Sequence, residues 1–114
     1  MLSEELQIYK DTKQLCQLLM KYQPNIPKSL RYGEYSKAVT LAFESLDMIY
    51  RCNADKAERA RLLDVLISKI GGVRDRINIF AETSQMAIRQ ASNAVFVCEK
   101  VLKQARGWRN ISRK

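Results

Sequence analysis

The sequence predicts an all-α protein, an antiparallel up-down-up-down four-helix bundle that forms one domain over residues 1–114. Apolar residues recur every three or four positions along nearly the whole chain, and a clean alternation with a period of two persists nowhere. With only four glycines and two prolines, the chain holds little of the turn material that a many-stranded fold needs. Its 114 residues suit a single domain with a substantial core.

The first helix is expected over residues 2–22. Its apolar positions form two adjoining stripes, which are Leu2, Leu6, Tyr9 and Cys16, and Ile8, Leu15, Leu19 and Tyr22. Pro24 and Pro27 end this helix, because neither can continue the backbone hydrogen-bond ladder.

The second helix is expected over residues 29–52, with Ser29 as its N-cap, although Lys28 or Gly33 could also mark its start. Its apolar residues again recur at spacings of three and four. They are Tyr35, Ala38, Val39, Ala42, Phe43, Leu46, Ile49 and Tyr50.

The third helix is expected over residues 55–82, capped by Asn53 or Asp55, and the fourth over residues 84–108, capped by Thr83 or Ser84. Residues 109–114 are expected to form a basic tail. The third stripe is the most regular of the chain, with Leu63, Leu66, Ile70, Val73, Ile77 and Phe80. The fourth is rich in alanine, with Ala87, Ala91, Ala94, Cys98, Val101, Ala105 and Trp108.

Two features suggest contact with other molecules. Gly71 and Gly72 face away from the seam of the third helix, where bare backbone permits close approach by another subunit or a phosphate, or simply tolerates a kink. Around Phe96 the fourth helix is apolar beyond a single face, which predicts self-association. Gly71, Gly72 and Phe96 are therefore the expected oligomer contacts.

The sequence contains no histidine, which removes the commonest general base and the commonest metal ligand. It also lacks a glycine-rich phosphate loop and a paired-carboxylate motif. We therefore expect no enzyme activity, no cofactor and no metal. Cys16, Cys52 and Cys98 form no CxxC pair and are interpreted as buried structural thiols.

The net charge of +8 lies entirely in the second half of the chain. Residues 1–50 hold six basic and six acidic residues, whereas residues 51–114 hold fourteen and six. Such asymmetry suggests a polyanionic partner such as nucleic acid, or else a solubilising tail with cations at a helix C-terminus. The cations expected to bind nucleic acid are Arg61, Lys69 and Arg76 on the third helix, Arg89, Lys100, Lys103 and Arg106 on the fourth, and Arg109.

Trp108 could stack on a base or serve as a buried anchor that closes the bundle. No signal peptide is visible at the N-terminus, and the longest apolar run, residues 94–98, is too short to span a bilayer. A soluble, cytoplasmic protein is expected.

Four motifs carry a resemblance to a known family. They are Tyr9-Lys10, the turn from Ile26 to Gly33, an alanine-bearing second helix, and Gly107-Trp108. The chain resembles the four-helix-bundle family of the accessory variability proteins of diversity-generating retroelements and the proteins of ribosomal RNA intervening sequences. In this chain Gly33 follows Tyr32 directly, and this departure from the family pattern predicts a shifted start of the second helix.

The resemblance implies a basic homopentamer that binds RNA or DNA and associates with a reverse transcriptase. It carries over Lys28, Arg31 and Trp108 as family features. The main hypothesis is therefore a non-catalytic, nucleic-acid-binding accessory protein of a reverse transcriptase. The alternative is a structural oligomeric protein-interaction module with no nucleic-acid role.

Overall fold

The computed structural model describes residues 1–113 and contains no strand within them. This confirms the predicted all-helical class. Four long helices make up most of the chain: α1 (Gln7–Tyr22), α3 (Glu34–Ala54), α4 (Arg59–Glu82) and α5 (Ile88–Ser112). Three short segments join or precede them: the 3-10 helices η1 (Ser3–Glu5) and η2 (Gln23–Asn25), and α2 (Lys28–Arg31).

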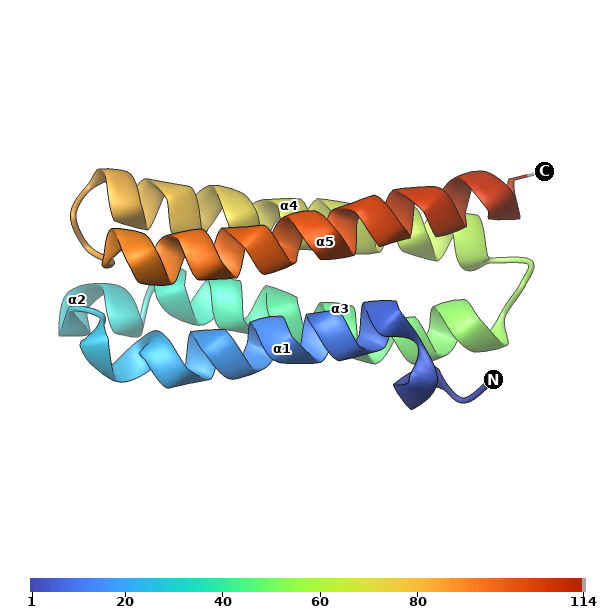
Figure 1. Ribbon diagram of the computed structural model, residues 1–114, viewed down its shortest axis with the longest axis horizontal. Coiled ribbons are helices and arrows are strands. Elements are labelled where there is room, and N and C mark those ends of the chain that lie inside the picture. The colour runs from blue at the N-terminus through green and yellow to red at the C-terminus, as the bar shows by residue number, and fades with distance from the viewer. Residues whose placement is uncertain (114) are drawn as a thin grey trace.

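The four long helices pack compactly along one axis, giving a molecule of 44 × 21 × 21 Å (Figure 1). α1 packs against α3 and α5, and α4 packs against the same two helices. α1 and α4 therefore lie on opposite sides of the molecule. No helix in the described part of the chain has the length and apolar character needed to cross a membrane.

The core is built mainly from the predicted apolar stripes, although four residues of those stripes are exposed: Leu2, Phe43, Tyr50 and Ala87. All six stripe residues of α4, from Leu63 to Phe80, are buried, and so are Ala91, Ala94 and Ala105 of α5. Alanine at these positions lets α5 approach its neighbours closely, and α4 and α5 form the most extensive helix pair of the molecule.

The first two predicted helices are interrupted. Leu6 has an extended backbone, with ψ at 137°, and separates η1 from α1. The predicted second helix is divided into α2 and α3, and Gly33 rather than Ser29 precedes the long helix. The Arg31 guanidinium donates hydrogen bonds to the carbonyls of Pro24 and Ile26, at 3.1 and 2.9 Å, and this holds α2 back against the preceding turn.

The third helix starts later than predicted, at Arg59. The carboxylate of Asp55 accepts a hydrogen bond from the Glu58 backbone N–H at 3.2 Å, so Asp55 organises the preceding turn. From there α4 continues through Gly71 and Gly72 without interruption.

The fourth helix is shifted toward the C-terminus relative to the prediction. Thr83 ends α4 by donating from Oγ1 to the Ile79 carbonyl at 2.8 Å, and Ser84 has a φ of 59°, so neither residue caps α5. At its far end α5 runs to Ser112, so the predicted tail is helical over most of its length. Lys114, the last residue of that tail, lies outside the described residues.

Candidate nucleic-acid interface

The outer side of α5 carries a row of cations that lack an acidic partner among residues 1–113. Arg89, Lys103 and Arg106 are exposed, and none of them forms an ion pair with another described residue. Arg89 and Lys103 are about four helical turns apart and therefore project from the same side of α5. We call these three residues the α5 row.

Lys100 lies beside this row, but its charge is directed inward. Its Nζ is 3.6 Å from the carboxylate of Asp11, which is only 5% exposed. The same carboxylate accepts hydrogen bonds from the amides of Gln7 and Gln104, at 3.0 and 2.7 Å. The Lys100 Nζ also lies 5.4 Å from the ring centroid of Phe96. Lys100 therefore makes contacts within the fold and is not wholly available to a ligand at the surface.

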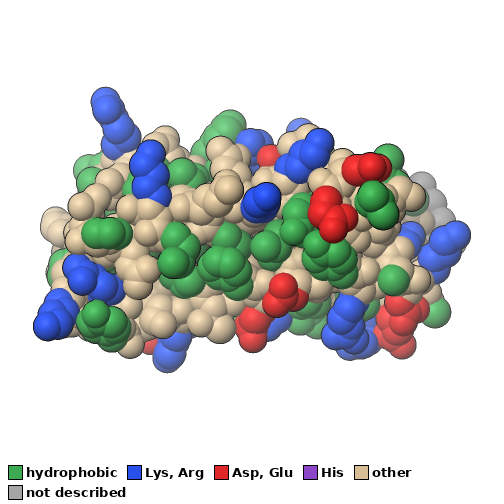
Figure 2. Space-filling view, turned by 90° about the horizontal axis from the view of Figure 1, so that it is seen from below, with side chains coloured by type: hydrophobic (Ala, Val, Ile, Leu, Met, Phe, Trp, Pro, Cys, Tyr) green, Lys and Arg blue, Asp and Glu red, His purple; other side chains and the backbone are tan. Residues whose placement is uncertain are grey.

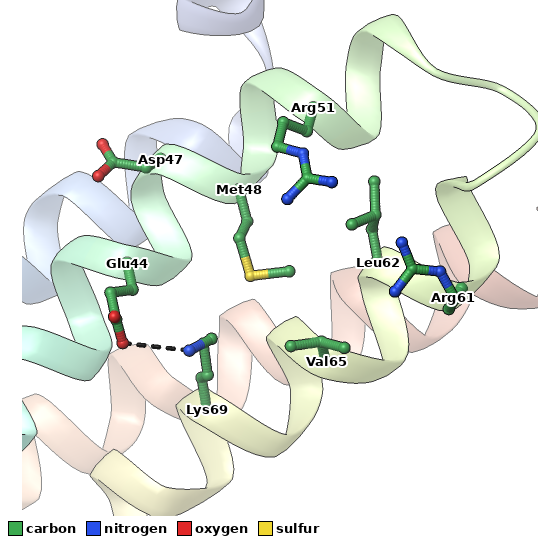
Figure 3. A pocket seen from close by; sticks show the side chains of 8 residues that line it. All are labelled: Glu44, Asp47, Met48, Arg51, Arg61, Leu62, Val65 and Lys69. Atoms are coloured by element: carbon green, nitrogen blue, oxygen red, sulfur yellow. Dashed lines mark hydrogen bonds and ion pairs between the residues drawn. The ribbon is translucent and has the colours of Figure 1, made fainter.

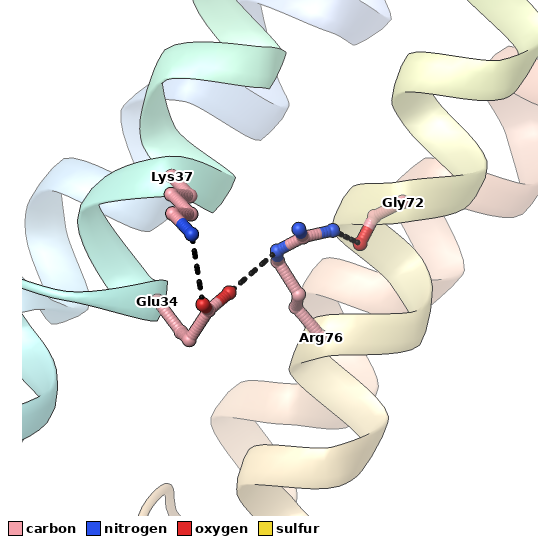
Figure 4. Close-up of polar contacts among 4 residues, drawn as sticks. All are labelled: Glu34, Lys37, Gly72 and Arg76. Carbon is pink, nitrogen blue, oxygen red and sulfur yellow. Dashed lines mark hydrogen bonds and ion pairs between the residues drawn. The ribbon is translucent and has the colours of Figure 1, made fainter.

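The predicted cations of α4 are all bound by carboxylates. Arg61 pairs with Glu58, and Lys69 pairs with Glu44 of α3 at 3.1 Å. Arg76 donates to Glu34 of α3 at 3.1 Å and to the Gly72 carbonyl at 3.1 Å (Figure 4). These pairs reduce the positive charge that α4 offers to a polyanion.

Glu34, the first residue of α3, forms ion pairs with two cations, Lys37 and Arg76 (Figure 4). Hydrogen bonds from Lys37 and Arg76 hold the pKa of its carboxyl below the ordinary value, because they stabilise the ionised form. The group is exposed, so water and salt screen this interaction.

A cleft of about 400 Å³ lies between α3 and α4 (Figure 3). Met48, Leu62 and Val65 line its apolar part, and the guanidinium groups of Arg51 and Arg61 reach over it from opposite helices. Guanidinium groups placed in this way can bind a phosphate or a carboxylate. The Lys69–Glu44 pair closes one end of the cleft.

The residues carried over from the family resemblance have unlike surroundings. Lys28 is exposed and has no acidic partner within the described chain. The donors of Arg31 are occupied by the carbonyls of Pro24 and Ile26. Trp108 is half-buried against the core, and the Arg59 guanidinium lies 5.1 Å from its ring centroid, which agrees with the interpretation of Trp108 as an anchor.

Arg109, at the end of α5, binds Asp64 of α4 at 3.1 Å, and the neighbouring Arg113 binds the same carboxylate at 2.8 Å. The charge of Arg109 is therefore partly balanced within the chain. This pairing also fastens the predicted tail to α4.

The three expected oligomer contacts differ in exposure. Phe96 is 65% exposed, and a Cβ on Gly71 would meet nothing closer than an Arg74 nitrogen at 3.9 Å. Gly72 departs from the expectation of bare outer surface, because a Cβ there would lie 3.4 Å from Leu41 of α3 and 3.2 Å from Arg76. Gly72 thus allows α3 and α4 to approach each other within one chain.

Sequence reasoning missed several cations that the structure leaves exposed. The charge of the missed lysines on α1 was hidden because the first half of the chain is neutral by count, although Glu34 and Glu44 in that half are bound to α4. A helical wheel of residues 7–22 would have placed two of them, Lys10 and Lys21, opposite the apolar stripe. The exposed cations that sequence reasoning missed and that have no acidic partner in the described chain are Lys10, Lys13 and Lys21 of α1, Arg51 of α3, and Lys56.

The cysteines are buried and free, which confirms their interpretation as buried thiols. Burial raises the pKa of Cys16 and Cys52 to about 11 and that of Cys98 to about 12, since the thiolate is poorly solvated in the core. Among residues 1–113 no group of three acidic or cysteine side chains is placed to hold a metal ion.

No protein-family model matches the sequence, and no curated protein matches it. The resemblance described above therefore stays a prediction.

Proposed function

We propose that this protein is a non-catalytic, oligomeric helical bundle that binds RNA or DNA by charge in the cytoplasm. In this proposal its four long helices run antiparallel, up-down-up-down. The protein serves a reverse transcriptase of a diversity-generating retroelement as an accessory subunit, as the family resemblance implies, and assembles as a homopentamer.

The observation that carries the nucleic-acid proposal is the contrast between α4 and α5. Four of the five cations of α4 are bound by carboxylates and Arg59 donates to the carbonyls of Cys52 and Asn53, whereas Arg89, Lys103 and Arg106 have no acidic partner in the described chain. Lys10 on α1, which packs against α5, is also exposed and unpaired within residues 1–113. When unpaired cations of a protein neutralise phosphates, the nucleic acid releases its condensed counterions, and this release favours binding. The face formed by α1 and α5 is therefore the favoured interface.

Binding of this kind contacts phosphates and not base edges. The α5 row stands on a rigid helix whose opposite side is buried in the core, so the charges keep a fixed spacing. We expect sequence-tolerant binding whose affinity falls steeply with salt.

The test replaces the α5 row by alanine (R89A/K103A/R106A) and measures the affinity for single-stranded RNA and for DNA over a salt series. The triple variant is expected to bind more weakly, and the slope of log affinity against log salt should fall by about 0.7 to 0.9 for each phosphate that the variant no longer neutralises. The matched control replaces three paired cations, K37A/R61A/K69A, and should keep most of the affinity and of the slope. Equal weakening in both variants, or absence of binding by the unaltered protein at low salt, contradicts the proposal.

The reverse-transcriptase partnership has its own test. A transcriptase encoded beside this gene should retain the unaltered protein on a column at low salt and release it as the salt concentration rises. Loss of retention for the α5-row variant would place the enzyme, or the nucleic acid it carries, on the same face. No retention at any salt concentration contradicts the partnership and leaves the nucleic-acid test unaffected.

A second candidate function is a structural protein-interaction module with no nucleic-acid role. It is favoured by apolar surface that the described chain leaves uncovered, including Phe96 and a groove between α1 and α3. Under this alternative the α5-row variant assembles like the unaltered protein, and neither one binds nucleic acid.

A further inference from the structure

An apolar groove of about 530 Å³ runs between α1 and α3. Met20 from α1 is 49% exposed and Phe43 from α3 is 41% exposed, so both large apolar side chains are accessible in the groove. Figure 2 views the molecule from the side of α1 and α3, and hydrophobic side chains form a broken band along it. The groove is lined by Tyr9, Lys13, Cys16, Gln17, Met20, Lys21, Phe43 and Leu46.

The α1 edge of this groove is positively charged. Lys13 and Lys21 both line it, and neither forms an ion pair with any other residue in the described range. They are eight residues apart on one helix, which separates their Cα atoms by about 12 Å along its axis. A partner that fits the groove therefore combines an apolar ridge with two negative charges at a similar separation.

The outer side of α4 carries such a ridge. Ile79 is 54% exposed, and the exposed carboxylates of Asp75 and Glu82 lie one turn before and one turn after it. Asp75 also pairs with Arg74 of the same helix at 3.2 Å, whereas Glu82 forms no ion pair with another described residue. These two acids are seven residues apart, which is about 10 Å along the helix axis. Gly71, one turn before Asp75, adds bare backbone with no side chain to hold another helix away. We call Gly71, Asp75, Ile79 and Glu82 the α4 ridge.

Other apolar surface of the chain fits the groove less well. Phe96 on α5 is exposed, but Arg89, Lys100 and Lys103 surround it, and these would meet the lysines of the groove. Two copies of the groove placed face to face would leave both hollows unfilled. The α4 ridge combines a protruding apolar side chain with charges opposite in sign to the groove lysines.

From this complementarity we infer that the α1–α3 groove binds the α4 ridge of a second copy of the chain. Ile79 of one copy enters the groove of the next against Met20 and Phe43, and Asp75 and Glu82 lie near Lys13 and Lys21. The two surfaces are different and α1 and α4 lie on opposite sides of the molecule, so one copy can use both at once. The contact is heterologous and generates a ring or a filament. The inference deepens the self-association in the proposed function and does not depend on nucleic-acid binding.

The test exchanges charge between the two surfaces. Sedimentation velocity at rising protein concentration should show the unaltered chain associating beyond the monomer. The groove variant K13E/K21E and the ridge variant D75K/E82K each place like charges in contact, so each should weaken association by at least about tenfold. The quadruple variant carries both exchanges, restores opposite charges across the contact and should regain association.

Two controls keep the result specific. The variant R89E/K103E changes charge by the same amount as the groove variant but lies on α5, and it should associate like the unaltered protein. Ile79→Ser removes the apolar anchor without altering charge and should weaken association. All substituted residues are exposed, and circular dichroism melts verify that each variant is folded.

A monomeric unaltered protein at every concentration overturns the inference, and so does a quadruple variant that fails to regain association. RNA affinity measured on the same samples separates these outcomes from those of the nucleic-acid proposal. If the folded chain is monomeric but still binds RNA through the α5 row, the proposed interface is wrong and the nucleic-acid proposal stands.

Discussion

Lys100 and Lys103 are three residues apart on α5 and look equivalent in the sequence, yet their roles in the structure differ. Lys100 lies 3.6 Å from a carboxylate of Asp11 that is almost fully buried. Lys103 is exposed and has no acidic partner among residues 1–113. One cation therefore stabilises a buried charge, and the other is available to a polyanion.

Replacement of these two lysines should separate stability from binding. Lys100→Ala leaves Asp11 with only its amide donors and should lower the free energy of unfolding by about 1 to 2 kcal/mol. Lys103→Ala should leave stability within about 0.5 kcal/mol of the unaltered protein and weaken RNA binding more than Lys100→Ala does. Urea unfolding and salt-series binding measure the two effects.

If the two alanine variants prove equal in both measurements, Asp11 is held by Gln7 and Gln104 alone. Lys100→Arg is the conservative control and should retain most of the stability, because it restores a cation beside Asp11.

At the scale of the helices, the sequence predicted the apolar stripes well and the helix ends poorly. The third stripe, from Leu63 to Phe80, is buried as expected because its periodicity reports directly on one helix face. The break between α2 and α3 depends on the Arg31 guanidinium reaching back to the carbonyls of Pro24 and Ile26. The extension of α5 through residue 112 accompanies the binding of Arg109 to Asp64 on another helix. Such contacts between distant residues have no local signal.

The two glycines of α4 should respond differently to alanine. Gly71→Ala places its Cβ in ordinary contact with the end of the Arg74 side chain, 3.9 Å away, and should stabilise the chain by about 0.5 to 1 kcal/mol through helix propensity. Gly72→Ala places its Cβ 3.4 Å from Leu41 and 3.2 Å from Arg76, so part or all of that gain should disappear. Thermal melts of the two variants, measured where the protein is monomeric, give the comparison.

An equal gain in stability from both alanines would show that α3 yields to the new methyl group without cost. The Gly71 variant also reports on the α4 ridge, since a side chain there should weaken self-association while it stabilises the single chain.

Over the whole molecule, the sign of the surplus charge was predictable and its location was not. The sequence predicted basic rows on both α4 and α5, but carboxylates bind the predicted α4 cations, and two of these carboxylates come from another helix. Glu34 and Glu44 come from α3 and bind Arg76 and Lys69 across the helix interface. Counting charges along the chain cannot detect this neutralisation, because it joins residues 25 to 42 positions apart.

These ion pairs predict a loss of stability in acid. The pKa of Glu34 is held below its ordinary value of 4.5, so its contribution is complete above that value and disappears as the pH falls through the lower pKa of the folded state. Protonation of the carboxylates also raises the net positive charge and with it the repulsion within the molecule. The melting temperature should be nearly constant above about pH 5 and should fall below about pH 4.5.

Glu34→Gln should reduce the acid-induced fall in melting temperature, because this residue no longer titrates. Glu5→Gln is the matched control, since Glu5 is exposed and has no ion pair within the described residues. A fall that is unchanged by Glu34→Gln would assign acid sensitivity to other carboxylates.

The buried carboxylate of Asp11 also fixes the axial register of α1 against α5. Its partners Gln104 and Lys100 are one turn apart on α5, and Gln7 is one turn before Asp11 on α1. A slip of one helical turn would move the carboxylate by about 5.4 Å away from Gln104 and Lys100, and leave it buried with only the Gln7 amide of its own helix as donor. Apolar stripes tolerate such a slip, because one alanine or valine replaces another at the interface. This single polar cluster therefore selects one alignment from several that the apolar pattern alone would allow.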